Sequence, residues 1–142
     1  MTNKLYIMRG LPGSGKSTQA MLRINMAWGT ICYCSADLFH TNIETDEYNW
    51  KPENVHYAHQ WCQLEARSAM NQGFDAIIVD NTNIKKKDYQ YYLDIAKQYD
   101  YEVEYLVSDT EWAWDVEECF KRNTHNVPLD VIQRMKDSYE PH

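Results

Sequence analysis

Two periodicities divide the chain into alternating elements. Short apolar and β-branched runs predict strands, whereas longer stretches repeat apolar residues every three or four positions, as amphipathic helices do. The predicted strands cover about Lys4 to Arg9, Thr30 to Cys34, Asp75 to Asp80 and Tyr101 to Val107. The predicted helices run from Lys16 or Ser17 to about Trp28, from Pro52 to Gly73, from Lys85 to Tyr99, from Glu111 to Arg122 and from Pro128 to Tyr139.

The order of these elements predicts a parallel sheet. Strands that alternate with helices are joined by right-handed crossovers, which place helices on both faces of the sheet. Residues 76–79 form a continuous apolar run, typical of a central strand, whereas Tyr101 to Val107 alternates like a strand nearer the edge. The polar segment from His40 to Lys51 is expected to form a loop or a partly helical excursion.

Each helix is expected to pack one apolar face on the sheet. The residues expected to face inward are Met21, Ile24 and Trp28 in the first helix, and Trp112, Val116, Cys119 and Phe120 in the helix that ends at Arg122.

A glycine-rich turn links the first strand to the first helix. The phosphate-binding pattern G-x-x-x-x-G-K-[ST] is satisfied by Gly10, Gly15, Lys16 and Ser17, in the strand-turn-helix setting that it requires. The glycines allow backbone N–H groups to converge on an anion at a helix N-terminus. Lys16 adds a positive charge for the β- and γ-phosphates, and the Ser17 hydroxyl is a natural Mg²⁺ ligand. The chain is therefore predicted to bind a nucleotide.

This motif also specifies the fold class. We expect an α/β fold, a P-loop NTPase-type three-layer sandwich, whose parallel sheet has about four strands with helices on both faces. A length of 142 residues fits a single P-loop kinase domain, 1–142, and no apolar run is long enough to span a membrane.

Charge and cysteine content indicate the class of protein and the redox compartment in which it functions. The net charge of −7 argues against a protein that coats nucleic acid non-specifically, but it is compatible with a local basic groove. The four cysteines lack zinc-finger spacing and are expected to be free thiols in a reducing compartment. A cytoplasmic protein is expected.

Two carboxylates follow predicted strands and should meet at the phosphate-binding loop, because ligands of parallel α/β sheets bind beyond the carboxyl ends of the strands. Asp80 ends its apolar strand in the manner of a Walker-B residue that holds Mg²⁺. Asp37 follows a different strand and is the better candidate for the base that takes the proton of an acceptor hydroxyl. The alternative for each is a helix or turn cap without a chemical role.

Arg122 is the candidate for a lid arginine. Phosphoryl transfer requires positive charge beyond the γ-phosphate, and Arg122 precedes the break between the last two predicted helices. The alternative is an arginine that only interacts with the dipole at the end of its helix.

Four stretches of the chain resemble the polynucleotide-kinase-like P-loop kinases. This group includes the 5′-hydroxyl kinase domain of phage polynucleotide kinase and related domains of animal ubiquitin-ligase-binding proteins. The stretches are Arg9 to Thr18, Ser35 to Asp37, Asp80 to Asn83 and Arg122 to Pro128. The last two, Asp-Asn-Thr-Asn and Arg-Asn-x-His-x-Val-Pro, are more specific than the phosphate loop, and the resemblance covers nearly the whole chain.

The resemblance implies ATP and Mg²⁺ as cofactors and implies roles at matching positions. Asp37 becomes the base, Asp80 an active-site carboxylate, Arg122 a lid arginine on the phosphates, and Val127 a neighbour of the adenine. The catalytic residues are then Asp37, Lys16, Arg122 and Asp80, and the metal ligands are Ser17 and Asp80. The nucleotide-binding residues are Gly10, Pro12, Gly13, Ser14, Gly15, Lys16, Ser17, Thr18, Arg122 and Val127.

The acceptor side departs from the family pattern. His40 occupies the position of an arginine that, in the phage kinase, helps to hold the phosphate of the acceptor nucleotide. The lid is shorter and carries His125 near the position of a second arginine.

These features support several functions. The leading hypothesis is an ATP-dependent kinase for a hydroxyl of a nucleic acid, most simply the 5′-hydroxyl of a polynucleotide, with DNA favoured over RNA as the partner. A hydroxyl on a hydroxymethyl pyrimidine base in DNA, as in phage DNA modification, is the close alternative, because it would need no grip on a phosphate. A nucleoside or small-metabolite kinase and a non-catalytic ATP-binding module are the others.

Overall fold

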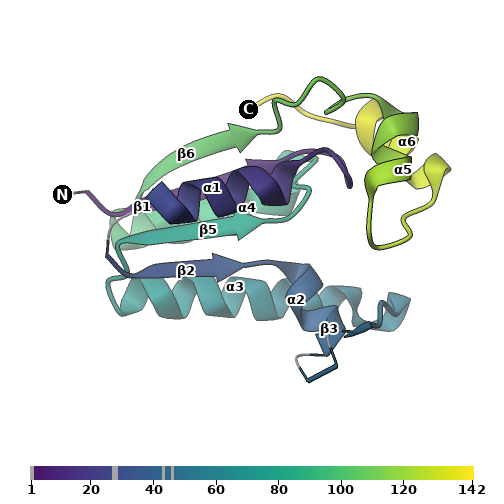
Figure 1. Ribbon diagram of the computed structural model, residues 1–142. Coiled ribbons are helices and arrows are strands. Elements are labelled where there is room, and N and C mark those ends of the chain that lie inside the picture. The colour runs from purple at the N-terminus through teal and green to yellow at the C-terminus, as the bar shows by residue number, and fades with distance from the viewer. Residues whose placement is uncertain (1, 27–28, 43, 46) are drawn as a thin grey trace.

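The computed structural model of the chain describes residues 2–26, 29–42, 44–45 and 47–142. Its main sheet has four parallel strands in the order β2-β5-β1-β6 (Figure 1). Their bounds are β1 (Lys4–Arg9), β2 (Ile31–Cys34), β5 (Ala76–Asp80) and β6 (Glu102–Val107). The predicted α/β fold is confirmed, and so are the four parallel strands, the central position of the strand that ends at Asp80 and the edge position of the last strand.

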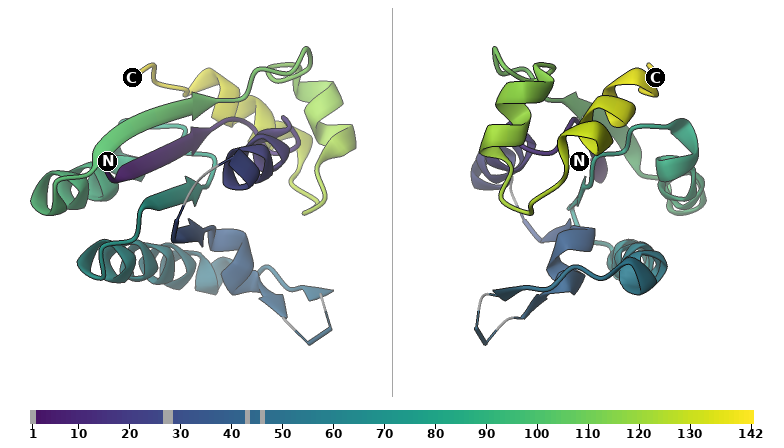
Figure 2. Two further views of the ribbon diagram at one scale, coloured as in Figure 1. Left: turned by 60° about the vertical axis from the view of Figure 1, so that its left-hand side comes forward. Right: turned by 90° about the vertical axis from the view of Figure 1, so that its right-hand side faces the viewer.

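Helices cover both faces of this sheet and its carboxyl end (Figures 1 and 2). Their bounds are α1 (Lys16–Met26), α2 (Ala36–His40), α3 (Val55–Asn71), α4 (Lys86–Tyr99), α5 (Val116–Arg122) and α6 (Leu129–Asp137), and a 3₁₀ turn, η1 (Pro52–Asn54), leads into α3. Within the described residues, no helix has the length and apolar character needed to cross a membrane.

Alternation along the strands assigns the two faces of the sheet. In β1, Leu5 and Ile7 belong to the cluster formed with α3 and α4, whereas Tyr6 and Met8 pack with Ala20 of α1. Strand β5 divides its buried residues between the same two clusters. Because side chains of a strand point alternately to opposite faces, a strand covered on both sides is apolar throughout. This explains why β5 could be recognised from its uninterrupted apolar run.

A third cluster lies beyond the carboxyl ends of the strands. Leu11, which follows β1, and Ile84, which follows β5, pack against Val116 and Cys119 of α5 and Ile132 of α6. Figure 1 shows α5 and α6 at the end to which the strand arrows point. The two helices therefore stand beside the glycine-rich turn.

The start of α5 differs from the prediction. The helix expected from Glu111 begins at Val116, because the Asp115 carboxylate accepts a hydrogen bond from the Glu118 N–H at 3.1 Å and so caps the helix. Residues 111–114 form turns. Phe120, expected to face inward, is 44% exposed, because Val116 and Cys119 occupy the inner face of this short helix.

The inner face of α1 is also shifted relative to the prediction. Met21 is 45% exposed, whereas Ala20 is fully buried and Ile24 is partly buried. Lys16 is buried at the start of α1. The buried face of the helix therefore contains the residues four and eight positions later, Ala20 and Ile24. Trp28, predicted for the same face, lies outside the described residues.

The segment from 40 to 51 contains a small β-hairpin, which the sequence pattern did not predict. Strands β3 (Thr41–Asn42) and β4 (Glu47–Tyr48) pair antiparallel, and the Asn49 N–H donates to the His40 carbonyl at 2.8 Å. Strands of two residues are too short to show a period in the sequence. Figure 2 shows this hairpin projecting away from the main sheet beyond α2.

A fully buried arginine ties the C-terminal residues to β1. Arg9 Nε donates to the Asn83 carbonyl at 2.8 Å, and Nη2 donates to the carbonyls of Ile84 and Glu140 at 2.9 and 2.6 Å. Its guanidinium also lies over two aromatic rings, those of Tyr89 and Tyr139, at 4.7 and 4.5 Å from their centroids. Because a buried cation is costly without partners, these contacts hold the end of β1 in one position.

Replacing this arginine should destabilise the fold strongly. Arg9→Leu removes the guanidinium donors of the Asn83 and Glu140 carbonyls and the cation that packs on two rings, so we expect the free energy of unfolding, measured by urea denaturation, to fall by at least about 3 kcal/mol. Arg134→Leu is the matched control, because the Arg134 side chain is 73% exposed and pairs with Asp130 on the surface; its effect should stay within about 0.5 kcal/mol. Equal effects of the two substitutions would contradict this role of Arg9.

Candidate active site

The glycine-rich turn is held from outside by the segment that follows β6. Thr110 Oγ1 donates to the Ser14 carbonyl at 2.8 Å, and Trp112 Nε1 donates to the Gly13 carbonyl at 3.0 Å. The Ser14 hydroxyl also shares a hydrogen bond of 2.8 Å with the hydroxyl of Ser108. These contacts engage two carbonyl oxygens and one hydroxyl of the loop. The loop also lines a cavity of about 570 Å³ at the carboxyl end of the sheet.

Helix α5 packs directly on this turn. Gly13 has a φ of +78°, and a Cβ built there would lie 2.2 Å from the Cys119 carbonyl oxygen and 2.8 Å from the Asn123 nitrogen. Gly15 has a φ of +91°, which an L side chain rarely adopts. Glycine is therefore required at both positions for conformation, and a Cβ would also meet the α5 backbone at Gly13 and the Thr110 side chain at Gly15.

Asp80 is a buried carboxylate directly behind Lys16 and Ser17 of the cavity wall. It is 2% exposed, and its Oδ1 accepts from Lys16 Nζ at 3.1 Å while its Oδ2 accepts from Ser17 Oγ at 3.0 Å. Tyr33 of β2 also donates its hydroxyl to Oδ2. Burial and the nearby Asp80 charge raise the pKa of Tyr33, so Tyr33 remains a hydrogen-bond donor across the physiological range.

The Asp80 and Ser17 oxygens fit a Mg²⁺ ion that is shared with phosphate groups. Mg²⁺ is usually held by one or two protein oxygens together with substrate phosphates and water. In the part of the chain that the structure describes, no group of three or more His, Cys, Asp or Glu side chains forms a metal site. The donor set here therefore suits an ion that arrives with a nucleotide.

Asp37 lies across the cavity, in the first turn of α2. The Ser35 hydroxyl caps this helix by accepting from the Asp37 N–H at 3.3 Å, and the Asn81 side chain accepts from the Ala36 N–H at 2.9 Å. The strand end that carries Asp80 therefore also orients the turn that carries Asp37. These hydrogen bonds leave the Asp37 carboxylate directed into the cavity that it lines.

The Asp37 carboxylate has two side-chain partners. His125 Nδ1 lies 3.3 Å from Oδ2, and the Tyr48 hydroxyl donates to Oδ1 at 3.3 Å. Partial burial raises the pKa of Asp37, but the hydrogen bond and charge of His125, the charge of Lys16 and the Tyr48 hydrogen bond together hold that pKa below its usual value. Asp37 is therefore ionised at neutral pH.

His40 faces the same side of the cavity. It is 6% exposed, its Nδ1 has no hydrogen-bond partner among the described residues, and burial lowers its pKa. Its ring meets the Tyr48 ring edge-on, with the centroids 5.9 Å apart. Trp50 and His59 also line this side. His40, Tyr48 and Trp50 therefore place rings without charge at neutral pH on this side of the cavity.

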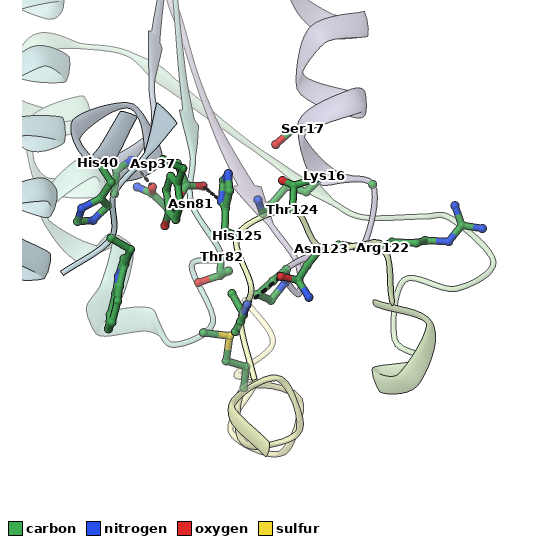
Figure 3. A pocket seen from close by; sticks show the side chains of 18 of the residues that line it. Lys16, Ser17, Asp37, His40, Asn81, Thr82, Arg122, Asn123, Thr124 and His125 are labelled. Atoms are coloured by element: carbon green, nitrogen blue, oxygen red, sulfur yellow. Dashed lines mark hydrogen bonds and ion pairs between the residues drawn. The ribbon is translucent and has the colours of Figure 1, made fainter. Parts of the chain in front are cut away.

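Arg122 reaches the cavity rim and not the phosphate loop. Its guanidinium lies 3.8 Å above the Trp112 ring, and its Nε donates to Glu118 Oε1 at 2.9 Å. Figure 3 shows the side chain directed away from Lys16 and Asp37. The alternative of a helix-end arginine matches these contacts, and the role on the phosphates stays a prediction.

The segment from 123 to 127 forms the remaining wall. Asn123 donates from Nδ2 to the Phe120 carbonyl at 2.7 Å and accepts from the Val127 N–H at 2.9 Å, so one side chain shapes the whole turn. Val127 is partly buried against the α5–α6 cluster and lines the cavity together with Met135. Thr124 and His125 of this turn also line the cavity, and Figure 3 shows His125 directed toward Asp37.

The structure thus brings most of the predicted site residues to one cavity. Those that line it are Pro12, Gly13, Gly15, Lys16, Ser17, Thr18, Asp37, Arg122 and Val127, while Asp80 lies directly behind Lys16 and Ser17. Sequence reasoning missed the contacts of Tyr33, Tyr48 and Trp112. Their aromatic side chains carried no motif, and only the fold reveals what they contact.

Comparisons with known proteins agree with this architecture. A family model described as "AAA domain" matches residues 5–142. NEDD4-binding protein 2 from Homo sapiens is 31% identical over 136 residues, which are 96% of this chain and 8% of that protein. This chain therefore spans a small part of that relative's length.

Solved structures share the fold at lower identity. One chain of the Pnkp1/Rnl/Hen1 RNA repair complex is similar with a TM-score of 0.72 and 20% identity, over 96% of this chain and 44% of that chain. The Mycobacterium tuberculosis APS kinase CysC, solved with AMPPNP and APS, is similar with a TM-score of 0.61 and 14% identity, over 99% of this chain and 80% of that chain.

Two glycines provide a matched test of the contact between α5 and the loop. Gly13 and Gly73 have φ values of +78° and +79°, but a Cβ at Gly73 meets nothing within 4 Å. We expect Gly13→Ala to weaken nucleotide binding, measured by isothermal titration, at least tenfold, because α5 must move away from the loop. Gly73→Ala should cost about 1 kcal/mol of stability through its backbone conformation and leave binding unchanged. Equal affinities of the two variants would refute this explanation.

Proposed function

Because the chain belongs to the AAA domain family, whose model matches residues 5–142, we propose that it is an ATP-dependent kinase that phosphorylates a hydroxyl of a nucleic acid. One observation carries this proposal. A phosphate-binding loop and an ionised carboxylate from a different strand end, Asp37, line the same cavity of about 570 Å³. That arrangement provides a place for a nucleotide and a place for an acceptor, as transfer between them requires.

Each residue of the proposed site has a separate role in phosphoryl transfer. Lys16 neutralises the β- and γ-phosphates, and Ser17 and Asp80 would hold a Mg²⁺ ion, which supplies further positive charge at the phosphate oxygens. The acceptor oxygen forms a bond to the γ-phosphorus while the bond from that phosphorus to ADP breaks. The proton of the acceptor hydroxyl passes to the Asp37 carboxylate.

The opposite wall suits the rest of the nucleotide. Val127 and Met135 offer apolar surface for an adenine ring near the turn that Asn123 shapes. Contact of Arg122 with the phosphates requires that its side chain leave Glu118. This is a half-exposed pair within one helix, of a kind that contributes about 0.5 kcal/mol, and loss of the contact with the Trp112 ring costs about 0.5–1 kcal/mol more. The proposed role of Arg122 is therefore energetically accessible.

The relatives support a nucleic-acid acceptor only in part. Pnkp1, a similar structure, stands in an RNA repair complex, whereas the similar APS kinase acts on a small molecule. The preference for DNA over RNA that the sequence suggested has no support among these proteins. We therefore propose a nucleic-acid hydroxyl, most simply the 5′-hydroxyl, as the acceptor. The acceptor test below distinguishes DNA from RNA.

One observation favours a second candidate, a kinase for a hydroxyl on a nucleic-acid base. Neutral rings line the part of the cavity around Asp37, among them His40, Tyr48 and Trp50. Among the described residues that line the cavity, the lysines and arginines are Lys16 and Arg122, both from the nucleotide side. A ring-lined acceptor site suits a base that carries the hydroxyl, because a base binds by stacking without a grip on phosphate.

The deciding experiment is transfer of labelled γ-phosphate from Mg-ATP to a panel of acceptors. The panel contains DNA and RNA oligonucleotides with free 5′-hydroxyls, a 5′-blocked DNA with one hydroxymethyl pyrimidine, and free nucleosides. Label on the free 5′ ends supports the leading proposal, and label on the blocked strand supports the base-hydroxyl kinase. Label only on nucleosides, or on none of the acceptors while ATP is bound, would overturn both.

Asp37→Asn should separate binding from chemistry. The amide cannot take the acceptor proton, so kcat should fall by about 10²- to 10⁴-fold while the affinity for ATP is unchanged. Asp94→Asn, at an exposed position of α4, is the matched control and should retain wild-type kcat. If Asp37→Asn retains wild-type kcat, the base is another group.

Salt should affect a polynucleotide acceptor only weakly. If the cavity contacts one acceptor phosphate, raising salt from about 50 to 200 mM should increase KM for a single-stranded acceptor about threefold, against about fiftyfold for four contacts. KM is measured at each salt concentration with Mg-ATP saturating. A steep dependence would show that cations outside the cavity hold the strand.

A further inference from the structure

We propose that His125 is a positioning residue that holds the Asp37 carboxylate and joins the 123–127 segment to the acceptor side of the cavity. The proposal rests on the kinase function above and extends it to a residue whose role neither the phosphate loop nor the strand ends define. It derives from a contact between three segments that are distant in sequence: the turn that begins α2, the β3–β4 hairpin and the turn between α5 and α6.

The contact is a closed triangle of side chains. His125 Nδ1 lies 3.3 Å from Asp37 Oδ2, and the Tyr48 hydroxyl donates to Asp37 Oδ1 at 3.3 Å. The third side is a stack of the His125 and Tyr48 rings, with centroids 3.9 Å apart and planes at 11°. Each residue therefore touches the other two. In Figure 3, His125 reaches across the cavity toward Asp37.

The two hydrogen bonds fix the orientation of the Asp37 carboxylate. An ionised carboxylate only accepts hydrogen bonds, so the proton of the imidazole must be on Nδ1 when it contacts Asp37. With one donor on each oxygen, rotation of the carboxylate would break both hydrogen bonds, while each oxygen keeps a free lone pair for an acceptor hydroxyl. Distances of 3.3 Å are long, as is common before a substrate binds, and leave room to shorten.

The fold of the turn does not depend on His125. The Asn123 N–H donates to the Cys119 carbonyl at 2.9 Å, and the Val127 N–H donates to the Asn123 side chain at 2.9 Å, so Asn123 already shapes the turn. The His125 side chain is 33% exposed. A residue needed only for packing would be buried in the α5–α6 cluster, whereas this one reaches across the cavity to the base.

The charge around Asp37 predicts how His125 affects it. The titratable and charged groups that face Asp37 are Lys16 of α1, Tyr33 of β2, His40 of α2, Tyr48 of β4 and His125. Partial burial raises the pKa of Asp37, and His125 supplies the largest opposing effect. Removing the imidazole should therefore raise the pKa of Asp37 and protonate the base at a higher pH.

Two substitutions at this position separate the hydrogen bond from the stack. In His125→Asn, the side-chain amide nitrogen can occupy the place of Nδ1, so the donor is kept and the ring is lost. In His125→Phe, the ring is kept and the donor is lost. We expect His125→Phe to lower kcat at least tenfold with little change in KM for ATP, and His125→Asn to stay within about threefold of the wild type.

The pH profile gives a readout that a merely structural role would not change. Because the ionised carboxylate is the active form, activity is lost as pH falls through the pKa of Asp37. In His125→Phe that pKa rises, so the acid limb of kcat/KM should move to higher pH, while in His125→Asn, which keeps the hydrogen bond but not the charge, the limb should move by a clearly smaller amount. Equal effects of the two variants, or an unshifted limb in His125→Phe, would overturn the proposal.

A second measurement keeps this test independent of the proposed activity. Titration of the Asp37 side-chain carboxyl by ¹³C NMR, assigned with Asp37→Asn, reports its pKa whether or not phosphate is transferred. A higher pKa in His125→Phe than in the wild type supports the contact, and an unchanged pKa overturns it. A wild-type protein that binds Mg-ATP but phosphorylates no acceptor would refute the kinase function instead, so the two failures are distinguishable.

Discussion

The site is organised around one buried carboxylate. Asp80 is 2% exposed and accepts hydrogen bonds from Lys16, Ser17 and Tyr33. A buried charge must be paired, because loss of its partners leaves an uncompensated ion in a medium of low dielectric constant. Those partners come from the start of α1 and from β2, so Asp80 sets how both elements meet β5. The exposed Met21 and the buried Ala20 follow from this constraint, since Lys16 determines the rotation of α1.

The sequence predicted the parts of the fold that depend on local patterns. The uninterrupted apolar run of β5 and the glycine-rich turn are both local signals, and the parallel order of strands and helices converts them into a site at the carboxyl edge. The hairpin of β3 and β4 could not be predicted, because two-residue strands show no period and their pairing is decided by contacts with α2. The delayed start of α5 was a missed capping signal, Asp115 followed by Glu118.

The Asp-Asn-Thr-Asn stretch shows how a motif can combine chemistry with architecture. Asp80 accepts hydrogen bonds from the Lys16 and Ser17 side chains, whereas the Thr82 carbonyl accepts from the Gly10 N–H. Asn83, at a φ of +47°, donates to the Met8 carbonyl at 2.7 Å, and its own carbonyl receives Arg9. Asn81 accepts from the Ala36 N–H and so orients the turn that carries Asp37. A motif match alone identifies all of these positions as important, but the contacts assign most of them to holding neighbouring loops in place.

Under the proposed function, the cavity has a nucleotide half and an acceptor half, and the two differ in how they are built. The nucleotide half rests on long, buried elements and on backbone contacts such as that of Gly13 with α5. The acceptor half rests on a five-residue helix and two strands of two residues, elements that are marginal without tertiary contacts. Tyr48 supplies such contacts through Asp37 and His125. Order in the hairpin is therefore coupled to the Asp37 carboxylate, and under the proposed function an acceptor that engages Asp37 would also act on the hairpin.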